Sequence, residues 1–460
     1  MRWVPVLAGR PGPKYRALAE ALVQDVQSGA LRPGTKLPTH RDLALALGVT
    51  IGTVSRGYAE VQRLGLITGE VGRGSFVGGD SGLGTLGERA ESPLAQIDLS
   101  LNYPASAGIE DAAIRNALST VAKRPLRGLL GYQHNGATPE QREAAAKWLG
   151  NGDLTPTPDQ IILTCGAQHA LAVALSSICD PGDTIATEAL TYPGMRALSL
   201  MLGFRLKGIA VDEEGLIPEA FKTACESARI RALYTIPTLH NPTTATLPKA
   251  RREKIIEVAR EHDVVVIEDD VYGFLAPSRP PSMTKIAGDQ VIYLTSVSKW
   301  IAAGMRVGFI VPPRKLVPKM SAVLRTTVWM APPPMLECFR VMVESGDAMK
   351  VARARLAETR ARQLIAVKSL KTFNYETHPN ASHVWLKLPE PWLEQDFVGL
   401  ARRRGLLLMA ADAFAVTRNA GAGRIRLSLG SPETRADLAR GMEILVDLLN
   451  DDPRLVGPYF

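Results

Sequence analysis

The stretch Ser296-Val297-Ser298-Lys299, followed seven residues later by Arg306, decides the fold of most of this chain. A lysine amine can condense with an aldehyde, while neighbouring hydroxyls and a guanidinium can neutralise a phosphate group. These residues therefore have the chemistry needed to hold a phosphorylated aldehyde as a Schiff base. A lone lysine after a serine is usually a surface residue, so the prediction depends on what the chain places around it.

Short apolar runs alternate with longer amphipathic segments on both sides of this stretch. The expected strands are Gln160–Thr164, Thr184–Thr187, Ala232–Ile236, Val264–Glu268, Val291–Thr295 and Gly308–Val311, and the expected helices include Ala167–Ile178 and Pro248–Glu261. Such alternation predicts an α/β domain with a mostly parallel sheet. In that architecture, ligand-binding groups lie on the loops that follow the strand ends.

The first two strand ends carry groups suited to a phosphate and to a flat ring. Gly166, Ala167 and Gln168 open a helix whose free backbone N–H groups and positive dipole end suit a phosphate. Tyr192 follows the next strand, where its ring could stack on an aromatic ring. Each signal is weak alone, and Tyr192 could equally be ordinary packing.

Later strand ends add polar groups suited to a substituted pyridine. Asn241 places an amide where a phenolic oxygen could accept a hydrogen bond, and Tyr272 could share that oxygen. A buried Asp269 could pair with a protonated pyridine nitrogen, which makes such a ring an electron sink. Arg426, on a late strand, suits a bidentate contact to a carboxylate. A structural ion pair is the alternative for Arg426, and Arg424 competes for the same role.

The first 78 residues have a different composition from the rest of the chain. They contain ten Lys and Arg against five Asp and Glu, within a chain of net charge +8. Apolar residues at helical spacing predict a helix from Lys14 to Val26 and a third helix from Ile51 to Leu64. Between them, Thr39 can cap a second helix that ends at Leu47 and a Gly48-Val49-Thr50 turn. This layout predicts a helix-turn-helix.

A predicted hairpin follows the third helix, with strands at 66–68 and 75–77 and a basic, glycine-rich tip. The hairpin would be the wing of a winged helix. The third helix would then enter the major groove of DNA with Thr50, Thr53 and Arg56, while Arg41 and Arg73 would hold the backbone or probe the minor groove. The alternative is that the helix-turn-helix only mediates protein contacts and that the arginines are solvated surface charges.

Bulk composition sets broader limits. A length of 460 residues predicts two or three domains, and 46% hydrophobic with 22% charged residues is typical of a globular protein. Residues 79–95, rich in Gly, Ser and charge, are expected to be a flexible linker. No signal-like start or membrane-length apolar run is present, and the four cysteines are scattered without metal-ligand spacing. We therefore expect a cytoplasmic protein with no membrane association and no metal site.

The N-terminal segment resembles the GntR family of bacterial repressors. The resemblance rests on the stretch Leu37–Ala44, the Gly48-Val49-Thr50 turn and the Gly72-Arg73-Gly74 wing tip. That family often places arginines on the recognition helix where this chain has Ile51 and Ser55. The base-reading role therefore does not carry over to those two positions, and Arg56 becomes the substitute candidate.

The ordered set of strand-end residues over 96–460 resembles the fold-type I aminotransferases, which use pyridoxal 5′-phosphate (PLP). The resemblance implies that Lys299 forms a Schiff base with PLP, Asp269 pairs with its pyridine nitrogen, and Tyr192 stacks on its ring. It also implies that Asn241 and Tyr272 hold the ring hydroxyl and that Arg426 binds an α-carboxylate. Tyr132 would reach the phosphate held by a neighbouring subunit. The residues implied to bind the phosphate within one chain are Gly166, Ala167, Gln168, Ser296, Ser298 and Arg306. The family usually has an aromatic residue between the serine and the lysine, where this chain has Val297-Ser298.

The combination of both halves resembles the MocR group of bacterial transcriptional regulators. That resemblance implies a winged helix-turn-helix at 1–78, a linker at 79–95 and a PLP-binding, dimerising effector domain at 96–460. It also implies a head-to-tail homodimer on repeated sites of double-stranded operator DNA, which senses an amino compound or PLP itself. Two alternatives stay open: a working aminotransferase with an accessory DNA-binding module, and a plain repressor whose second domain serves only dimerisation.

Overall fold

The chain forms two compact units, Met1–Ala90 and Glu91–Phe460, each with a hydrophobic core of its own. The computed structural model describes residues 3–5, 7, 13–27, 31, 35–63, 67–70, 74–77, 96–133, 136–417 and 420–451. The linker expected at 79–95 and the wing-tip residue Arg73 lie outside the described residues. No helix formed by the described residues is long and apolar enough to cross a bilayer.

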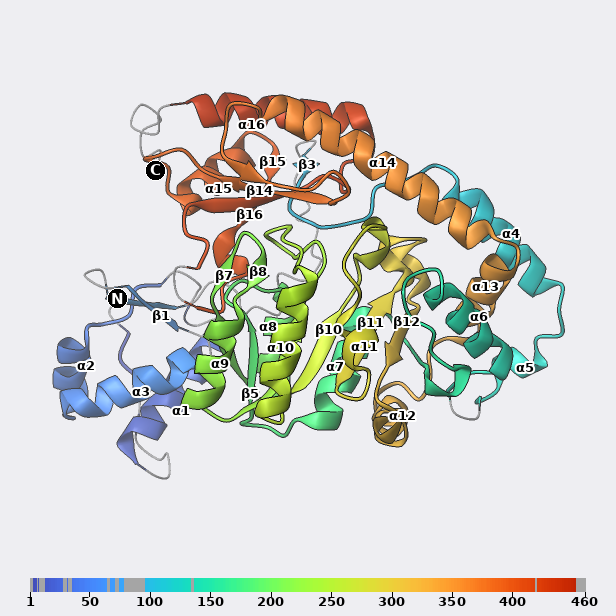
Figure 1. Ribbon diagram of the computed structural model, residues 1–460. Coiled ribbons are helices and arrows are strands. Elements are labelled where there is room, and N and C mark those ends of the chain that lie inside the picture. The colour runs from blue at the N-terminus through green and yellow to red at the C-terminus, as the bar shows by residue number, and fades with distance from the viewer. Residues whose placement is uncertain are drawn as a thin grey trace. The chain divides into compact units, whose positions relative to one another are not determined.

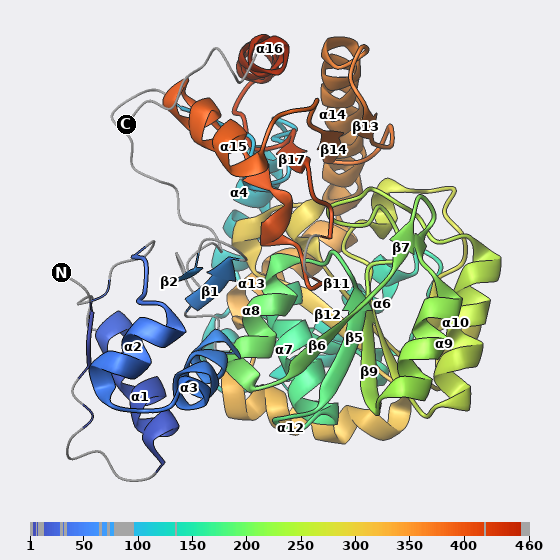
Figure 2. The same ribbon diagram turned by 90° about the vertical axis from the view of Figure 1, so that its left-hand side faces the viewer.

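The N-terminal unit consists of three helices followed by an antiparallel hairpin (Figure 2). The elements are α1 (Lys14–Gln27), α2 (His40–Leu47), α3 (Ile51–Arg63), β1 (Ile67–Glu70) and β2 (Gly74–Val77). Thr39 caps α2 by accepting a hydrogen bond from the backbone N–H of Asp42 at 3.2 Å. Gly48 ends the helix in the left-handed region, with a φ of 60°. The predicted helix-turn-helix is therefore confirmed.

Close packing between α1 and α3 holds this unit together. Gly57 allows the approach, because a Cβ at this position would lie 2.9 Å from Leu18 Cδ2 and 3.0 Å from the carbonyl oxygen of Tyr15. Tyr58 is buried and donates a hydrogen bond to the carbonyl oxygen of Pro38 at 3.0 Å, which ties α3 to the connector before α2. The helices thus form a fixed platform for the exposed face of α3.

A seven-stranded sheet organises the second unit (Figure 1). Its strands, in spatial order, are β4 (Ile162–Thr164), β12 (Gly308–Val311), β11 (Val291–Ser296), β10 (Val265–Asp269), β9 (Ile230–Thr235), β5 (Thr184–Glu188) and β6 (Arg205–Ile209). Only β12 runs opposite to its neighbours, so the prediction of a mostly parallel sheet is confirmed. The expected start of β4 at Gln160 is wrong: Pro158 opens a 3-10 turn that ends at Gln160, and the strand begins after it.

Helices cover both faces of this sheet, and side chains alternate between the two resulting cores. On β10, for example, Val266 packs into one core and Ile267 into the other. One face is covered by α6 (Pro139–Leu149), α7 (Ala167–Ile178), α8 (Pro193–Leu202), α12 (Val317–Thr327) and α13 (Pro333–Glu344). The other is covered by α9 (Pro218–Ser227), α10 (Lys249–Glu261) and α11 (Met283–Ala287).

A smaller antiparallel sheet forms the C-terminal part of this unit. Its order is β13 (Tyr375–Glu376), β14 (His383–Lys387), β17 (Arg424–Ser428) and β16 (Met409–Ala410), packed with α14 (Asp347–Ser369), α15 (Glu394–Arg403) and α16 (Arg435–Asn450). The chain enters the unit here, because β3 (Ile97–Asp98) pairs in parallel with β15 (Leu406–Leu407). The other α-helices and strands of the described residues are α4 (Glu110–Ala122), α5 (Arg127–Leu130), β7 (Val211–Asp212) and β8 (Gly215–Leu216).

Candidate cofactor and nucleic-acid sites

Lys299 lies in a single 3-10 turn, Val297–Lys299, directly after β11. Its side chain is half-buried, and its amine donates a hydrogen bond to the backbone carbonyl oxygen of Asn102. The Nζ atom lies 6.0 Å from the centre of the Tyr272 ring. Burial lowers the pKa of Lys299 to about 7, the charge of Arg426 acts in the same direction, and that of Asp269 opposes it. The amine is thus largely neutral just above neutral pH, which is the form that attacks a carbonyl.

Three consecutive acidic residues lie at the end of β10: Glu268 and Asp269 are its last two residues, and Asp270 is the first residue of the loop after it. Their side chains alternate between the faces of the sheet. Asp269 lies on the same side as Ile267, while Glu268 and Asp270 lie on the opposite side. Glu268 contacts α11 there, and Asp270 contacts Tyr293 and Arg279. Burial raises the pKa of Asp269 to about 7. Its carboxylate oxygens accept hydrogen bonds from Tyr234 Oη at 2.7 Å and from the backbone N–H of Val271 at 3.3 Å.

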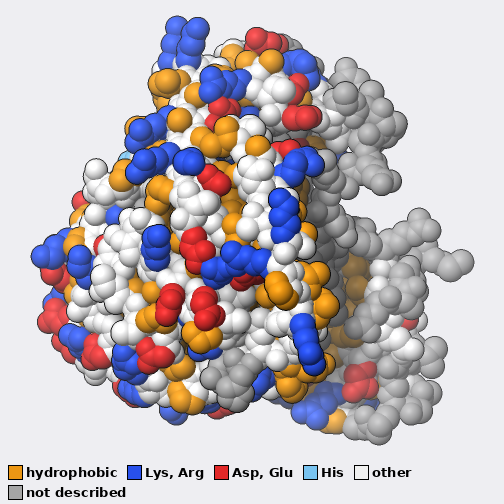
Figure 3. All heavy atoms as spheres, turned by 90° about the vertical axis from the view of Figure 1, so that its right-hand side faces the viewer, with side chains coloured by type: hydrophobic (Ala, Val, Ile, Leu, Met, Phe, Trp, Pro, Cys, Tyr) orange, Lys and Arg blue, Asp and Glu red, His pale blue; other side chains and the backbone are white. Residues whose placement is uncertain are grey.

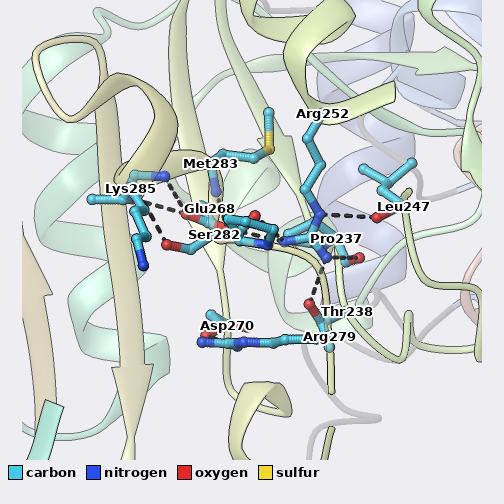
Figure 4. Close-up of polar contacts among 12 residues, drawn as sticks. Pro237, Thr238, Leu247, Arg252, Glu268, Asp270, Arg279, Ser282, Met283 and Lys285 are labelled. Atoms are coloured by element: carbon cyan, nitrogen blue, oxygen red, sulfur yellow. Dashed lines mark hydrogen bonds and ion pairs between the residues drawn. The ribbon is translucent and has the colours of Figure 1, made fainter. Parts of the chain in front are cut away.

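Figure 4 shows the polar network that holds the other two acids. Glu268 accepts a hydrogen bond from the backbone N–H of Met283 at 2.8 Å, and Arg252 lies 3.8 Å from it. Asp270 forms an ion pair with Arg279. Because these buried charges have partners of opposite sign, the backbone on both sides of Asp269 is fixed without any use of the Asp269 carboxylate.

Asn102 joins several of the expected site residues, although no sequence motif predicted a role for it. Its side-chain amide donates to Tyr272 Oη at 2.8 Å, and its side-chain oxygen accepts from Ser382 at 2.9 Å. Asn241, the residue expected beside the phenolic oxygen, instead accepts a hydrogen bond from Arg426 at 2.9 Å. Asn102 precedes Tyr272 by 170 residues and follows no strand of the large sheet, so strand-end reasoning could not find it.

Arg426 and Arg424 lie in different environments, which separates the two candidates. Arg426 is buried, and it also donates to the carbonyl oxygen of Ser100. Arg424 is half-buried and forms an ion pair with Glu376 at 2.7 Å. Burial lowers the pKa of Arg426 to about 10, which still leaves it charged at neutral pH. Arg426 is therefore the arginine of this pair that faces the other site residues.

The expected phosphate-binding residues meet where β4 and β12 approach each other. Gly166, with a φ of 87°, precedes α7, and a Cβ on it would lie 2.6 Å from the Arg306 guanidinium. Arg306 donates to the carbonyl oxygen of Cys165 at 2.9 Å. Ser296 is buried and accepts from the backbone N–H of Ser298 at 3.3 Å. Ala167 begins α7, so backbone N–H groups, hydroxyls and a guanidinium converge there.

Tyr192 and Gln168 pack over Gly194 at the start of α8. A Cβ on Gly194 would collide with the Tyr192 ring and with the Gln168 side-chain oxygen. Gln168 donates to the carbonyl oxygen of Gly194 at 3.1 Å. Burial raises the pKa of Tyr192 to about 12, so its ring stays neutral. The glycine thus lets the aromatic ring and the amide lie close together.

Several buried polar atoms in this region have no hydrogen-bond partner within the described part of the chain. Among them are Nε of Arg426 and the side-chain oxygen of Gln168. Buried polar atoms are nearly always satisfied, so unpartnered ones point to a missing ligand. A phosphorylated, carbonyl-bearing pyridine matches the donor set around them: an amine, a carboxylate, hydroxyls, and guanidinium and backbone N–H groups. The residues present therefore fit PLP.

Tyr132 lies away from these residues. Its side chain is 82% exposed, and its ring lies 5.1 Å from that of Trp329, which is 50% exposed. Leu126, just before α5, and Leu130, its last residue, are also exposed. Figure 3 views the face that carries α5 and shows hydrophobic side chains exposed among charged ones. Within one chain Tyr132 contributes nothing to the cluster around Lys299.

The N-terminal unit presents its own polar surface. Arg41 and Arg56 are exposed, and the hydroxyls of Thr50 and Thr53 lie 2.9 Å apart at the start of α3. Arg56 lines an open cavity of about 410 Å³ together with Arg16 of α1, a residue that the sequence reasoning did not single out. The other lining residues are Tyr15, Ala59 and Glu60. Neither Arg16 nor Arg56 forms an ion pair within the described residues.

Comparison with known proteins agrees with both halves of this description. Residues 95–443 match the family Aminotransferase class I and II, and residues 14–77 match the bacterial regulatory proteins of the gntR family. The chain belongs to the aminotransferase class I and II family, and its gntR-type N-terminal segment gives it the MocR-type architecture expected from the sequence.

Two relatives that match this chain over most of its length are named HTH-type transcriptional regulators. The chain is 30% identical over 460 residues to the uncharacterized HTH-type transcriptional regulator YdeF of Bacillus subtilis, covering 98% of this chain and 97% of that one. It is 27% identical to the HTH-type transcriptional regulator TauR of Rhodobacter capsulatus, covering 88% and 90% of the two chains. These matches are to regulators rather than to free-standing enzymes.

Solved structures show the fold of the second unit. An archaeal alanine:glyoxylate aminotransferase superposes with a TM-score of 0.72 at 24% identity, covering 78% of this chain and 91% of that one. LysN, an α-aminoadipate aminotransferase from Thermus thermophilus complexed with N-(5′-phosphopyridoxyl)-L-leucine, gives a TM-score of 0.71 at 23% identity, covering 81% and 97%. At these identities the likeness establishes the fold-type I architecture.

Proposed function

We propose that this protein is a PLP-dependent transcriptional regulator that binds double-stranded operator DNA and senses an amino compound, or PLP itself, through a Schiff base at Lys299. One observation carries the proposal: a helix-turn-helix unit and a cluster of PLP-compatible residues around a half-buried lysine occur in one chain. The proposed domains are the DNA-binding unit at 1–78, the linker at 79–95 and the effector domain at 96–460.

Each of the site residues has a proposed role toward the cofactor. Lys299 binds its carbonyl carbon, Asp269 its pyridine nitrogen, and Tyr192 the face of its ring. Tyr272 and Asn241 hold the ring hydroxyl, with Asn102 orienting Tyr272, while Gly166, Ala167, Gln168, Ser296, Ser298 and Arg306 hold the phosphate. When bound, PLP supplies an electron sink for bonds at an amino-bearing carbon. Arg426 then selects compounds that carry a carboxylate beside the amine.

The DNA-binding half of the proposal rests on the surface of α3 and its surroundings. Thr50 and Thr53 face the major groove, Arg56 lies at its edge against the DNA backbone, and Arg41 also contacts the backbone. Arg16 joins Arg56 in binding a backbone phosphate, because their cavity brings an α1 guanidinium beside one from α3. Reaching the chromosome requires a cytoplasmic location, and the four cysteines, all free, suit a reducing compartment.

Signalling requires that the ligand bind one arrangement of the protein better than another. A head-to-tail homodimer would provide such arrangements. Its support is the exposed apolar surface around Tyr132 and Trp329, which pairing with a second copy would cover. In that dimer, Tyr132 would reach the phosphate held by the partner subunit.

A second function, aminotransferase activity, has its own support. The residues that such chemistry requires, among them Lys299, Asp269, Tyr272 and Arg426, are all present on one unit. A sensor requires the same exchange of amines on Lys299, so their presence supports both functions. The two functions differ only in whether the cofactor would become aminated and a keto acid would be released.

The deciding experiment is an absorption titration of the purified, PLP-loaded protein with a panel of amino acids and amines. For a regulator, one compound shifts the Schiff-base absorbance, no keto acid accumulates, and the affinity for operator DNA changes. Accumulation of aminated cofactor that an added keto acid reverses would favour the enzyme. The variant Lys299→Ala should lose the absorbance while it keeps its fold, and an unchanged spectrum would refute the Schiff-base assignment. A parent protein that binds DNA but no PLP would be a plain repressor.

A further inference from the structure

A tyrosine inside the sheet is hydrogen-bonded to the carboxylate of Asp269, the residue proposed to pair with the pyridine nitrogen of PLP. Tyr234 lies in β9, next to β10, and its side chain is fully buried. Its hydroxyl donates to Oδ2 of Asp269 at 2.7 Å, while the backbone N–H of Val271 donates to Oδ1 at 3.3 Å. One donor on each oxygen fixes both the rotation and the tilt of the carboxylate.

This hydrogen bond also affects the charge of Asp269. Burial favours the neutral carboxylic acid and raises the pKa of Asp269, and the Tyr234 hydrogen bond is the strongest of the effects that lower it again. The other ionisable groups that act on Asp269, or on which Asp269 acts, are Glu188, Tyr192, Asp270, Tyr272 and Lys299. Glu188 and Asp270 raise the pKa of Asp269, so they cannot replace the tyrosine.

The neighbouring strand provides a matched comparison. Tyr293 lies in β11, on the other side of β10, and it is also buried. Its hydroxyl donates to Oδ2 of Asp270 at 2.8 Å, which is nearly the same hydrogen bond on the next carboxylate. Asp270, however, points away from the cofactor site and already has Arg279 as an ion-pair partner. Both tyrosines are buried on a strand next to β10 and donate one hydrogen bond to an aspartate, and they differ in which aspartate accepts it.

We propose that Tyr234 is a positioning residue that holds the Asp269 carboxylate in the orientation and the ionised state required to pair with the protonated pyridine nitrogen of PLP. The inference rests on the proposed function, because it requires PLP in this site. From the sequence, Tyr234 would be predicted only to be a buried residue of a strand, so its position in the strand does not reveal this role. The role does not depend on whether the protein releases a keto acid.

The test compares Tyr234→Phe with Tyr293→Phe, each loaded with PLP labelled with nitrogen-15 in the ring. Nitrogen-15 NMR reports whether the pyridine nitrogen is protonated, and equilibrium titration gives the PLP dissociation constant. We expect Tyr234→Phe to shift the nitrogen signal toward the neutral form at neutral pH and to weaken PLP binding about tenfold, the effect of one hydrogen bond to a charged group. Tyr293→Phe should leave the nitrogen signal as in the parent.

Each outcome separates the inference from the proposed function. A parent protein that binds no PLP overturns the proposed function. A parent that binds PLP, with both variants identical to it in nitrogen signal, overturns the positioning role alone, as do equal shifts in both variants. If Tyr234→Phe fails to fold, the nitrogen-15 signal of the PLP-loaded parent still tests the inference. The pyridine nitrogen should stay protonated from about pH 6 to 8, and a neutral nitrogen in that range would exclude an ionised Asp269 and overturn the inference.

Discussion

Lys299 combines two requirements that conflict for an ordinary lysine. A surface lysine is almost fully protonated near neutral pH and cannot attack an aldehyde, while a lysine buried among apolar groups would have no contact with a ligand. Here partial burial and the nearby Arg426 favour the neutral amine, while Asp269 limits the effect. The lysine thus remains partly exposed in the pH range in which its amine is largely neutral.

The pH dependence of PLP capture follows from this environment. Above a pKa of about 7 the Lys299 amine is neutral and nucleophilic, and below it the amine is protonated and inactive. The rate at which the empty protein captures PLP should therefore rise as pH increases from 6 to 8 and then level off. Stopped-flow absorbance over that range measures it. A rate that keeps rising to about pH 10, as for an exposed lysine, would contradict the assignment.

Arg426 should select ligands by their carboxylate. Replacing it by alanine removes a buried guanidinium, so amino acids should bind the PLP-loaded protein about 10- to 100-fold more weakly. The corresponding amines without the carboxylate should be nearly unaffected. Arg424→Ala is the control, because Arg424 pairs with Glu376 at 2.7 Å. Equal losses for amino acids and amines would show that Arg426 only supports the fold through Asn241.

Among the elements, α1 and α3 together make the surface expected to meet DNA. Arg16→Ala and Arg56→Ala should each weaken binding to operator and unrelated duplexes by similar factors, if both arginines contact phosphates in their shared cavity. The slope of log affinity against log salt should fall by about 1 for each substitution. Fluorescence anisotropy at several salt concentrations measures this.

The control for the arginine variants is Arg353→Ala, on the exposed side of α14 in the other unit, which should leave the salt slope unchanged. Loss of preference for the operator in Arg56→Ala, with an unchanged salt slope, would return Arg56 to the base-reading role first expected for it.

The junction of β12 with the loop after β4 has no space for an added methyl group. A Cβ on Gly308 would lie 2.5 Å from the carbonyl carbon of Gly166 and 2.7 Å from Oγ1 of Thr164. Gly308→Ala should therefore cost about 1–3 kcal/mol of unfolding free energy and weaken PLP binding through the displaced phosphate loop. Gly304→Ala, where nothing lies within 4 Å, is the control. Chemical denaturation and PLP titration measure both effects, and equal stability of the two variants would contradict the argument.

Local signals predicted most of these elements. The bounds of α7 agree with the sequence prediction at both ends, and the Thr39 cap was readable because short-range hydrogen bonds decide it. The contacts and roles of Asn102 and Tyr234 were not predictable. Asn102 acts through contacts with residues more than a hundred positions away, and Tyr234 has a polar function inside a strand that reads as apolar. The positions facing the cofactor follow from strand order, whereas the residues that orient them follow only from packing.

At the scale of the whole molecule, the two units have separate hydrophobic cores. We expect two unfolding transitions by calorimetry, and PLP should raise the midpoint of one. At a free concentration a hundred times the dissociation constant, the gain for that unit is about 2.7 kcal/mol. Lys299→Ala should reduce this gain and leave the other transition in place. A single transition that PLP shifts as a whole would show that the units unfold cooperatively.

The position of Asn102 has a further consequence for communication along the chain. The segment that enters the second unit pairs with β15 through β3, and four residues after β3 it reaches Asn102, whose carbonyl oxygen accepts from the Lys299 amine. A Schiff-base nitrogen has fewer N–H donors than a free amine. Formation of a Schiff base at Lys299 would therefore change the hydrogen bonding of the peptide that leads back toward the DNA-binding unit. Only a few residues of backbone separate this hydrogen bond from the segment that connects the two units.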